Sequence, residues 1–232
     1  MTIWNEDILK RPIFKGISTE SIARLLRTNS QRKSYEPNEV VFRKGDSLKY
    51  FCIIEKGLLK SSEYTNGGKE MSSSYFYHEK DMGTDYPFAI DAFPFYLIYG
   101  GMGKHTMDTY SVKSSTIIKI PIDELKPIVE SDPVFMKNVL MFVSEFACYS
   151  QIMLRAVEYR RVEERLSYWM LNVNESRNNI RIPYSQEVLA GMLHVSRSSL
   201  NQELIRLREE DLIEINKRKI IIKNVKYFLD LI

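Results

Sequence analysis

The sequence predicts an α+β protein, with an N-terminal antiparallel β-roll or jelly-roll barrel, then a long helix, then a C-terminal helix-turn-helix. Three observations lead to this prediction. Short β-type runs with glycine turns fill the first part, a sustained helical period follows, and two short amphipathic helices lie close together near the end. We therefore expect three parts: 1–130 for the β-roll, 131–159 for the long helix and a hinge, and 160–232 for the helix-turn-helix domain.

The first part contains short runs rich in β-branched and aromatic residues, punctuated by turn signals. Gly45-Asp46, Lys56-Gly57 and Asn66-Gly67-Gly68 mark the turns, and Asn-Gly between two such runs is a strong hairpin signal. Even spacing without a long intervening helix favours an antiparallel sandwich or barrel. The expected strands are Glu39–Phe42, Tyr50–Ile54, Leu58–Tyr64, Glu70–Tyr77 and Ser114–Pro121, and a short helix over residues 122–132 follows them.

A long helix is expected from Pro133 to about Tyr159. Asp132 suits the cap before it, and proline suits its first turn. Apolar residues recur along it in alternating steps of four and three residues, as in a coiled coil. We expect this seam to join two identical chains, although a helix buried in its own domain would show the same period. The seam residues are Phe135, Val139, Phe142, Phe146, Tyr149, Met153 and Ala156, and the charged stretch Glu158–Arg161 after them indicates a helix break or hinge.

The stretch from Ser185 to Leu207 shows a helical pattern that stops for three residues and then resumes. Ser185 can cap one helix and Ser196 a second one, with the break at His194-Val195-Ser196. Leu189, Met192 and Leu193 give the first helix an apolar face, and Leu200, Leu204 and Leu207 give the second an inward stripe. Two short helices joined in this way form a helix-turn-helix, although a plain helical hairpin that binds nothing has the same pattern.

Composition excludes several classes of protein. The chain has 232 residues, 44% hydrophobic and 27% charged, with a net charge of only +3, so local charge must decide whether nucleic acid is a partner. Its two cysteines, Cys52 and Cys148, are too few for a disulfide framework or an all-cysteine iron–sulfur site. We expect no secretory signal, no stretch as long as a membrane span, no cofactor and a cytoplasmic location.

The order of these segments resembles the CRP/FNR family of transcription regulators. The resemblance covers most of the chain, through PIFKGIS, VFRKGDSLKYFCIIEKGLLKSS, LAGMLHVSRSSLNQELIRL, EEDLI and IEINKRKIIIKN. It implies an effector-binding roll, a dimerisation helix, and a winged helix-turn-helix that binds palindromic double-stranded DNA. In this homodimer, the half-sites would lie about one helical turn apart.

The resemblance also assigns the DNA-contacting positions. His194 replaces the glycine usual in the family's turn, so we expect a positive φ angle there. The second helix begins without acids, and the stretch 215–228 has five bases and no acid, a local footprint for nucleic acid. The expected DNA-binding residues are Ser185, Gln186, Ser196, Arg197, Ser198, Ser199, Asn201, Gln202, Lys217, Arg218 and Lys219.

The region that would hold cyclic AMP in that family departs from its pattern. Residues 83–108 contain no arginine, and their only cations are Lys104 and His105. We therefore expect no control by cyclic AMP in the usual way, because a buried phosphate without an arginine fork loses its strongest bonds. The same region is aromatic, which indicates either an unknown small-molecule effector or packed core in place of a lost site. The candidate pocket residues are Tyr86, Phe88, Phe93, Phe95, Tyr96 and Tyr99.

Two other functions have to be weighed. A cupin-like metal enzyme would need a histidine cluster, and the roll has only His78 and His105. A lone His78 is also a poor basis for a haem site. A dimeric module that binds protein instead of DNA would share the helix-turn-helix pattern. We expect a regulator and not an enzyme, with RNA polymerase as a partner if the protein activates transcription.

Overall fold

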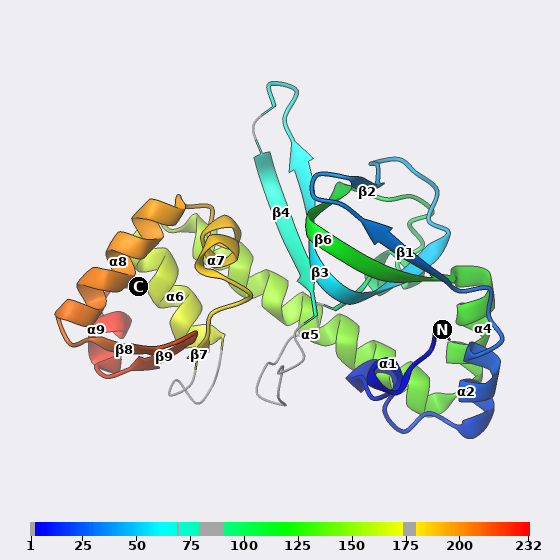
Figure 1. The fold of residues 1–232 in the computed structure, drawn as a ribbon. Coiled ribbons are helices and arrows are strands. Elements are labelled where there is room, and N and C mark those ends of the chain that lie inside the picture. Colours follow the sequence, from blue (N-terminus) through cyan, green and yellow to red (C-terminus); the bar gives the residue numbers. More distant parts are fainter. Residues whose placement is uncertain (1–2, 69, 79–90, 174–179) are drawn as a thin grey trace. The chain divides into compact units, whose positions relative to one another are not determined.

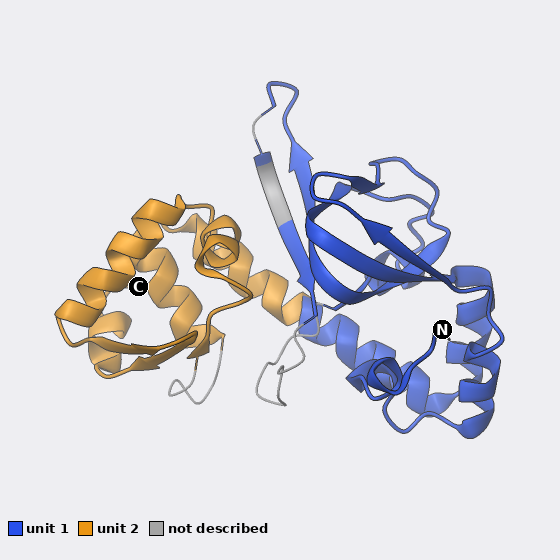
Figure 2. Ribbon diagram, in the orientation of Figure 1, with its two compact units in different colours: residues 1–82, 88–146 blue, residues 83–87, 147–232 orange. Residues whose placement is uncertain are grey.

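The computed structural model describes residues 3–68, 70–78, 91–173 and 180–232 (Figure 1). They form two compact units, coloured separately in Figure 2. The first unit runs to Phe146 and the second starts at Ala147. This boundary lies inside the long helix α5 (Pro133–Glu158), so that helix contributes residues to both units.

The first unit is built on one antiparallel sheet, as the sequence predicts. The strand order is β1-β6-β3-β4, with β2 also paired to β6 and β5 to β3. The strands are β1 (Gln31–Tyr35), β2 (Val40–Phe42), β3 (Tyr50–Tyr64), β4 (Glu70–Tyr77), β5 (Ala92–Phe93) and β6 (Asp108–Pro121). The helices are α1 (Glu6–Leu9), the 3₁₀ helix η1 (Pro12–Phe14), α2 (Thr19–Leu25), α3 (Phe95–Tyr99), α4 (Ile122–Ser131) and the first half of α5.

One predicted turn is wrong. Lys56-Gly57 does not separate two strands, because β3 continues through it from Tyr50 to Tyr64. The pairing of β3 with β6 shifts register on both sides of Lys56, and Gly57 has φ +98°. The pair therefore lies at an irregularity within one strand, where glycine supplies a backbone angle that other residues rarely adopt. The sequence analysis also did not predict β1 and β5, and the predicted start of β6, Ser114, lies six residues after the observed start, Asp108.

Two apolar cores lie on the two faces of this sheet. One contains Phe51, Ile53, Ile118 and Ile120 together with residues of the surrounding helices. Figure 1 shows α1, α2, α4 and the start of α5 gathered beside the sheet. The other core fills the interior of the roll, with the residues Tyr35, Val41, Phe42, Cys52, Ile54, Leu59, Phe76, Phe93 and Ile117.

Asp132 caps α5, as predicted. Its carboxylate accepts hydrogen bonds from the backbone N–H of Val134 at 3.0 Å and of Phe135 at 3.2 Å. It also accepts from Ser18 N at 2.8 Å and Ser21 Oγ at 2.7 Å, which ties α2 to the start of α5. Burial by itself would raise the pKa of Asp132, but these hydrogen bonds outweigh it and lower the pKa below its usual value.

The predicted seam of α5 faces inward. Phe135, Val139, Phe142, Tyr149 and Ala156 are each at most 7% exposed within a single chain, so they offer almost no surface to a partner. Their burial favours the alternative of a helix buried in its own domain. The reason is that the helix lies along its own units, where the seam supplies core residues. Phe146 and Met153 are half-buried.

The length of α5 also corrects an expectation about membrane spans. Among the described residues it is the one helix long and apolar enough to cross a membrane by length and composition. Core helices of globular proteins pass the same test, and Phe135, Val139 and Phe142 of α5 pack in the helix-side core of the first unit. One such helix is therefore weak evidence of a membrane span.

The second unit contains the end of α5 and the C-terminal elements. The break predicted at Glu158–Arg161 is confirmed, because α5 ends at Glu158 and α6 begins at Val162. Three short strands form a sheet in the order β7-β9-β8, in which β8 and β9 form the hairpin expected in the winged helix-turn-helix. The elements are α6 (Val162–Asn172), β7 (Ile180–Arg181), α7 (Gln186–Met192), α8 (Arg197–Glu209), β8 (Ile213–Asn216), β9 (Lys219–Ile222) and α9 (Val225–Leu229).

Candidate nucleic-acid interface

The two helices predicted from the break in the pattern are α7 and α8. Ser185 Oγ accepts from Val188 N at 3.2 Å, and Ser196 Oγ accepts from Ser199 N at 3.0 Å. Both serines therefore act as N-caps, which satisfies backbone donors that a helix start leaves free. The inward stripe Leu200, Leu204 and Leu207 is at most 1% exposed, and so are Leu189 and Leu193.

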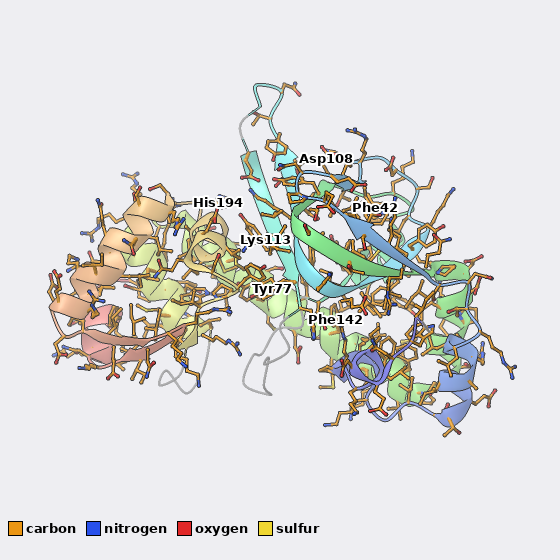
Figure 3. All side chains as sticks on the ribbon, in the orientation of Figure 1. Phe42, Tyr77, Asp108, Lys113, Phe142 and His194 are labelled. Atoms are coloured by element: carbon orange, nitrogen blue, oxygen red, sulfur yellow. The ribbon has the colours of Figure 1, made fainter. Side chains whose placement is uncertain are left out.

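The turn between these helices depends on His194. Its φ angle is +53°, as predicted, and Figure 3 marks it at the end of α7. The backbone N–H of His194 donates to Gly191 O at 3.2 Å, and that of Val195 donates to Ala190 O at 3.0 Å. These bonds end α7 and redirect the chain into α8, so a histidine takes the left-handed position that glycine usually occupies.

The outward face of α8 carries four of the eleven predicted DNA-binding residues, the candidate base readers. Arg197, Ser198, Asn201 and Gln202 are exposed. Ser199 is half-buried, so it does not belong to the open face; the hydroxyls of Ser199 and of the exposed Ser198 lie 2.7 Å and 2.8 Å from Ser196 Oγ. The open face thus presents a guanidinium, a hydroxyl and two amides, which are groups that can bond base edges or phosphates.

Basic residues lie at the tip of the β8–β9 hairpin. Lys217 has φ +55° at the turn, and both Lys217 and Lys219 are exposed. Arg218 is half-buried, and its guanidinium donates to Ile182 O at 2.8 Å, so it also holds the segment after β7. Lys223 pairs with Asp211 at 2.5 Å. The exposed lysines give the hairpin a positive tip.

Arg165 of α6 is a functional candidate that the sequence analysis missed. Its guanidinium donates to Tyr159 O at 2.7 Å, Leu193 O at 2.9 Å and His194 O at 3.0 Å. One side chain thus joins the hinge after α5 to the turn of the helix-turn-helix. The sequence offered no signal for it beyond one charge among several in EYRRVEERL.

Among the described residues, the aromatic side chains predicted to line the effector pocket do not line a single pocket. Tyr86 and Phe88 lie outside the described residues. Phe93 is stacked on Phe76 in the roll interior, whereas Phe95 packs against Phe51 on the helix side of the sheet. Tyr96 stacks on Phe146 with ring centroids 5.2 Å apart, and Tyr99 is 38% exposed. For Phe93 and Phe95 the structure therefore supports the alternative of packed core.

The cations of the same region are not arranged as a phosphate clamp. His105 is buried and stacks on Phe42, labelled in Figure 3, with ring centroids 4.1 Å apart. Burial lowers the pKa of His105, which favours the neutral ring. Lys104 is exposed.

Among the residues that the structure describes, His78 and the other potential metal ligands form no cluster. His78 Nδ1 lies 3.3 Å from Asp91, which also pairs with the buried Arg11 at 3.1 Å. Within the described ranges, no three His, Cys, Asp or Glu side chains are placed to hold a metal ion.

Comparison with known proteins identifies the C-terminal unit. Residues 164–231 match the model of the Crp-like helix-turn-helix domain. The chain is 21% identical over 201 residues to the fumarate and nitrate reduction regulatory protein of Salmonella typhi, covering 84% of this chain and 75% of that protein. It is 22% identical to the electron transport regulator A of Shewanella oneidensis, covering 83% and 74%.

Solved structures share the fold. A CooA mutant from Carboxydothermus hydrogenoformans has a TM-score of 0.63 at 14% identity, covering 99% of this chain and 96% of that one. FixK2 from Bradyrhizobium japonicum has a TM-score of 0.58 at 15% identity, covering 87% and 96%. The domain match and the relatives support a CRP/FNR-type transcription regulator, and the solved structures have the same fold.

Proposed function

We propose that this protein is a cytoplasmic homodimer that binds a two-fold symmetric DNA site through α8 and the β8–β9 hairpin. The observation that carries the proposal is the exposed set of Arg197, Ser198, Asn201 and Gln202 on one face of a capped helix. The exposed lysines Lys217 and Lys219 would add phosphate contacts beside that helix. In a dimer, two such helices would enter successive major grooves.

Selection of DNA from a random library tests this proposal. The purified protein is expected to enrich a two-fold symmetric sequence, with affinity that falls steeply as salt rises. Replacing Lys217 and Lys219 together by Gln should weaken binding to all sequences and lower the salt slope by about two. Lys15, exposed in the first unit, gives a matched control in Lys15→Gln. If no sequence is enriched in buffer or with added cell extract, the DNA-binding proposal is wrong.

The dimer contact is better assigned to the exposed side of α5 than to the predicted seam. Leu140 is 64% exposed and Leu154 is 65% exposed, 14 residues apart on the same helix. Met141 is 51% exposed and lies one heptad before Cys148, which is also exposed. Large apolar side chains at heptad spacing on an open helix face fit a second copy of the same helix.

Two measurements test this contact. Leu140→Glu with Leu154→Glu should shift the protein from dimer to monomer in light scattering, because both charges would be buried between helices. Leu229→Glu is the matched control, since Leu229 is 48% exposed in α9, outside α5. A short bis-maleimide should also join two chains through Cys148. A dimer that survives the double substitution would place the contact elsewhere.

We further propose that cyclic AMP does not control this protein in the usual way. No arginine is present in residues 83–108, and the buried His105 is stacked on an aromatic ring. A signal would act by shifting the populations of the hinge after α5, and so the spacing of the two α8 helices. Operator affinity should be the same with and without cyclic AMP. Run-off transcription with RNA polymerase would then separate activation from repression.

A further inference from the structure

Arg206 of α8 stands at the centre of a polar cluster in the second unit. Its guanidinium lies 2.5 Å from Glu163 of α6, 2.6 Å from Glu203 and 2.7 Å from Glu210. It also donates to the hydroxyl of Tyr227 in α9 at 3.2 Å, and that hydroxyl donates in turn to Glu163. One arginine therefore contacts side chains of three helices.

The cluster lies where three functional segments come together. Glu163 is in the first turn of α6, immediately after the hinge. Tyr227 is in α9, which follows β9 of the hairpin within three residues. Arg206 itself lies about two and a half turns after the start of α8, beyond the exposed readers. Its bonds therefore fix the rotation of α8 relative to both the hinge helix and the hairpin.

Partial burial makes these contacts stronger than surface ion pairs. The side chains of Glu163 and Glu203 are 17% and 15% exposed, whereas that of Glu210 is 47% exposed. Charge-assisted bonds in such surroundings are screened less by water and salt. Burial raises the pKa of the Tyr227 phenol, and its bond to Glu163 raises it further, so the hydroxyl keeps its proton for donation.

Without Arg206, the carboxylate of Glu203 would oppose DNA binding. It directly follows Gln202 on the helix that we propose to enter the major groove, where a free carboxylate would repel phosphates. Arg206 holds both of its oxygens, at 2.6 Å and 3.4 Å. The acid is thus turned back toward Arg206 and neutralised.

We propose that Arg206 is a positioning residue for DNA recognition: it locks the reading helix α8 to α6 and α9 and holds Glu203 away from DNA. The inference rests on the proposed function. It makes two separable claims, one about geometry and one about charge. Geometry governs the affinity for the selected operator relative to random duplex DNA, whereas charge acts on both kinds of DNA alike.

The experiment separates these two claims. Arg206→Met alone removes the lock and frees Glu203, so affinity for both DNAs should fall. Arg206→Met with Glu203→Gln removes the lock but restores the net charge. In the double variant, binding to random duplex should recover, while the ratio of operator to random affinity should stay about tenfold below that of the wild type.

Milder variants guard against a folding artefact. Tyr227→Phe removes one hydroxyl and no charge, and should lower the ratio in the same direction by about threefold. Glu210→Gln removes the exposed partner and is expected to leave the ratio unchanged. Thermal unfolding of each variant identifies the temperature at which all are folded, and binding is compared there.

The outcomes are distinct. If the wild type selects no operator, the proposed function fails. If the wild type selects one and both the double variant and Tyr227→Phe keep its ratio, then Arg206 is no positioning residue and the inference is overturned. A reduced ratio in both variants with recovered random binding in the double variant supports both claims.

Discussion

Replacing Gly57 by alanine is expected to destabilise the first unit strongly. Gly57 lies within β3 at φ +98°, opposite the β6 residues Ser114 and Ser115. A Cβ added there would lie 2.3 Å from Ser115 Oγ, 2.6 Å from Ser115 Cα and 2.7 Å from Ser114 O. Two of these three atoms belong to the backbone, so rotation of a side chain cannot relieve the clash.

The expected loss of stability in Gly57→Ala has two parts. Holding a residue with a side chain at this backbone angle costs about 1–3 kcal/mol. Separating two strands that are already in contact adds about 1–3 kcal/mol, as for other overpacked sites. The sum is about 2–6 kcal/mol, a large share of the stability of an ordinary domain. Gly45 supplies the control, because it has φ +92° but nothing within 4 Å of an added Cβ.

Urea unfolding followed by the fluorescence of Trp4, which is buried in the first unit, measures both variants in a Trp169→Phe background, because Trp169 would report the second unit. Gly45→Ala should lower the free energy of unfolding only by the cost of the backbone angle. Gly57→Ala should lower it by that cost and by the cost of separating the strands. The difference between the two variants isolates the close approach of β3 and β6. Equal losses would refute the reasoning, because they would mean that the strands separate without cost.

Three further predictions follow from the structure. Gln202→Ala should relax the base preference at one position of each half-site by about 1–3 kcal/mol, as measured by selection from single-substitution libraries; an unchanged preference would show that Gln202 reads no base. Asp132→Asn should destabilise the first unit by about 1–3 kcal/mol at pH 7 in urea unfolding. Because the pKa of Asp132 is lowered in the folded state, its contribution is present above the ordinary carboxyl pKa and is lost as the pH falls, so the variant should differ less from the wild type in acid; a gap that stays constant to low pH would contradict this. Finally, a thiol reagent at pH 8 should modify Cys148 in the dissociated Leu140→Glu, Leu154→Glu variant and leave Cys52 unmodified, because burial raises the pKa of Cys52 to about 12. Peptide mapping that finds Cys52 modified at a similar rate would show that the roll interior opens.

The helix-turn-helix was predictable because its determinants are local. Ser185 and Ser196 cap helices within three residues of themselves, and His194 is one of the few non-glycine types that tolerate its backbone angle. Arg165 and Arg206 were not predictable in the same way. Their long-range partners lie 21 to 43 residues away in sequence, and single charges among many others give no sign of such pairing.

The roll was predictable as a class but not strand by strand. Gly57 looks like a turn residue, and only the register between β3 and β6 shows that the strand continues through it. In β1 only Tyr35 is buried, so QRKSY shows no alternation of apolar residues. Its pairing with β6 comes from tertiary structure, which local pattern cannot report.

The α5 helix shows why a heptad pattern predicts a helix but does not predict what packs against its apolar face. One side, which includes Phe135 and Tyr149, is buried in its own chain, while another, which includes Leu140 and Leu154, is open. Both sides carry apolar residues at heptad spacing, and the more regular and aromatic one is the intramolecular one. Large aromatic side chains suit an irregular domain core, whereas a two-stranded contact needs a narrower stripe of aliphatic residues. The face left open after the chain has folded is therefore the better guide to a partner than the regularity of the period.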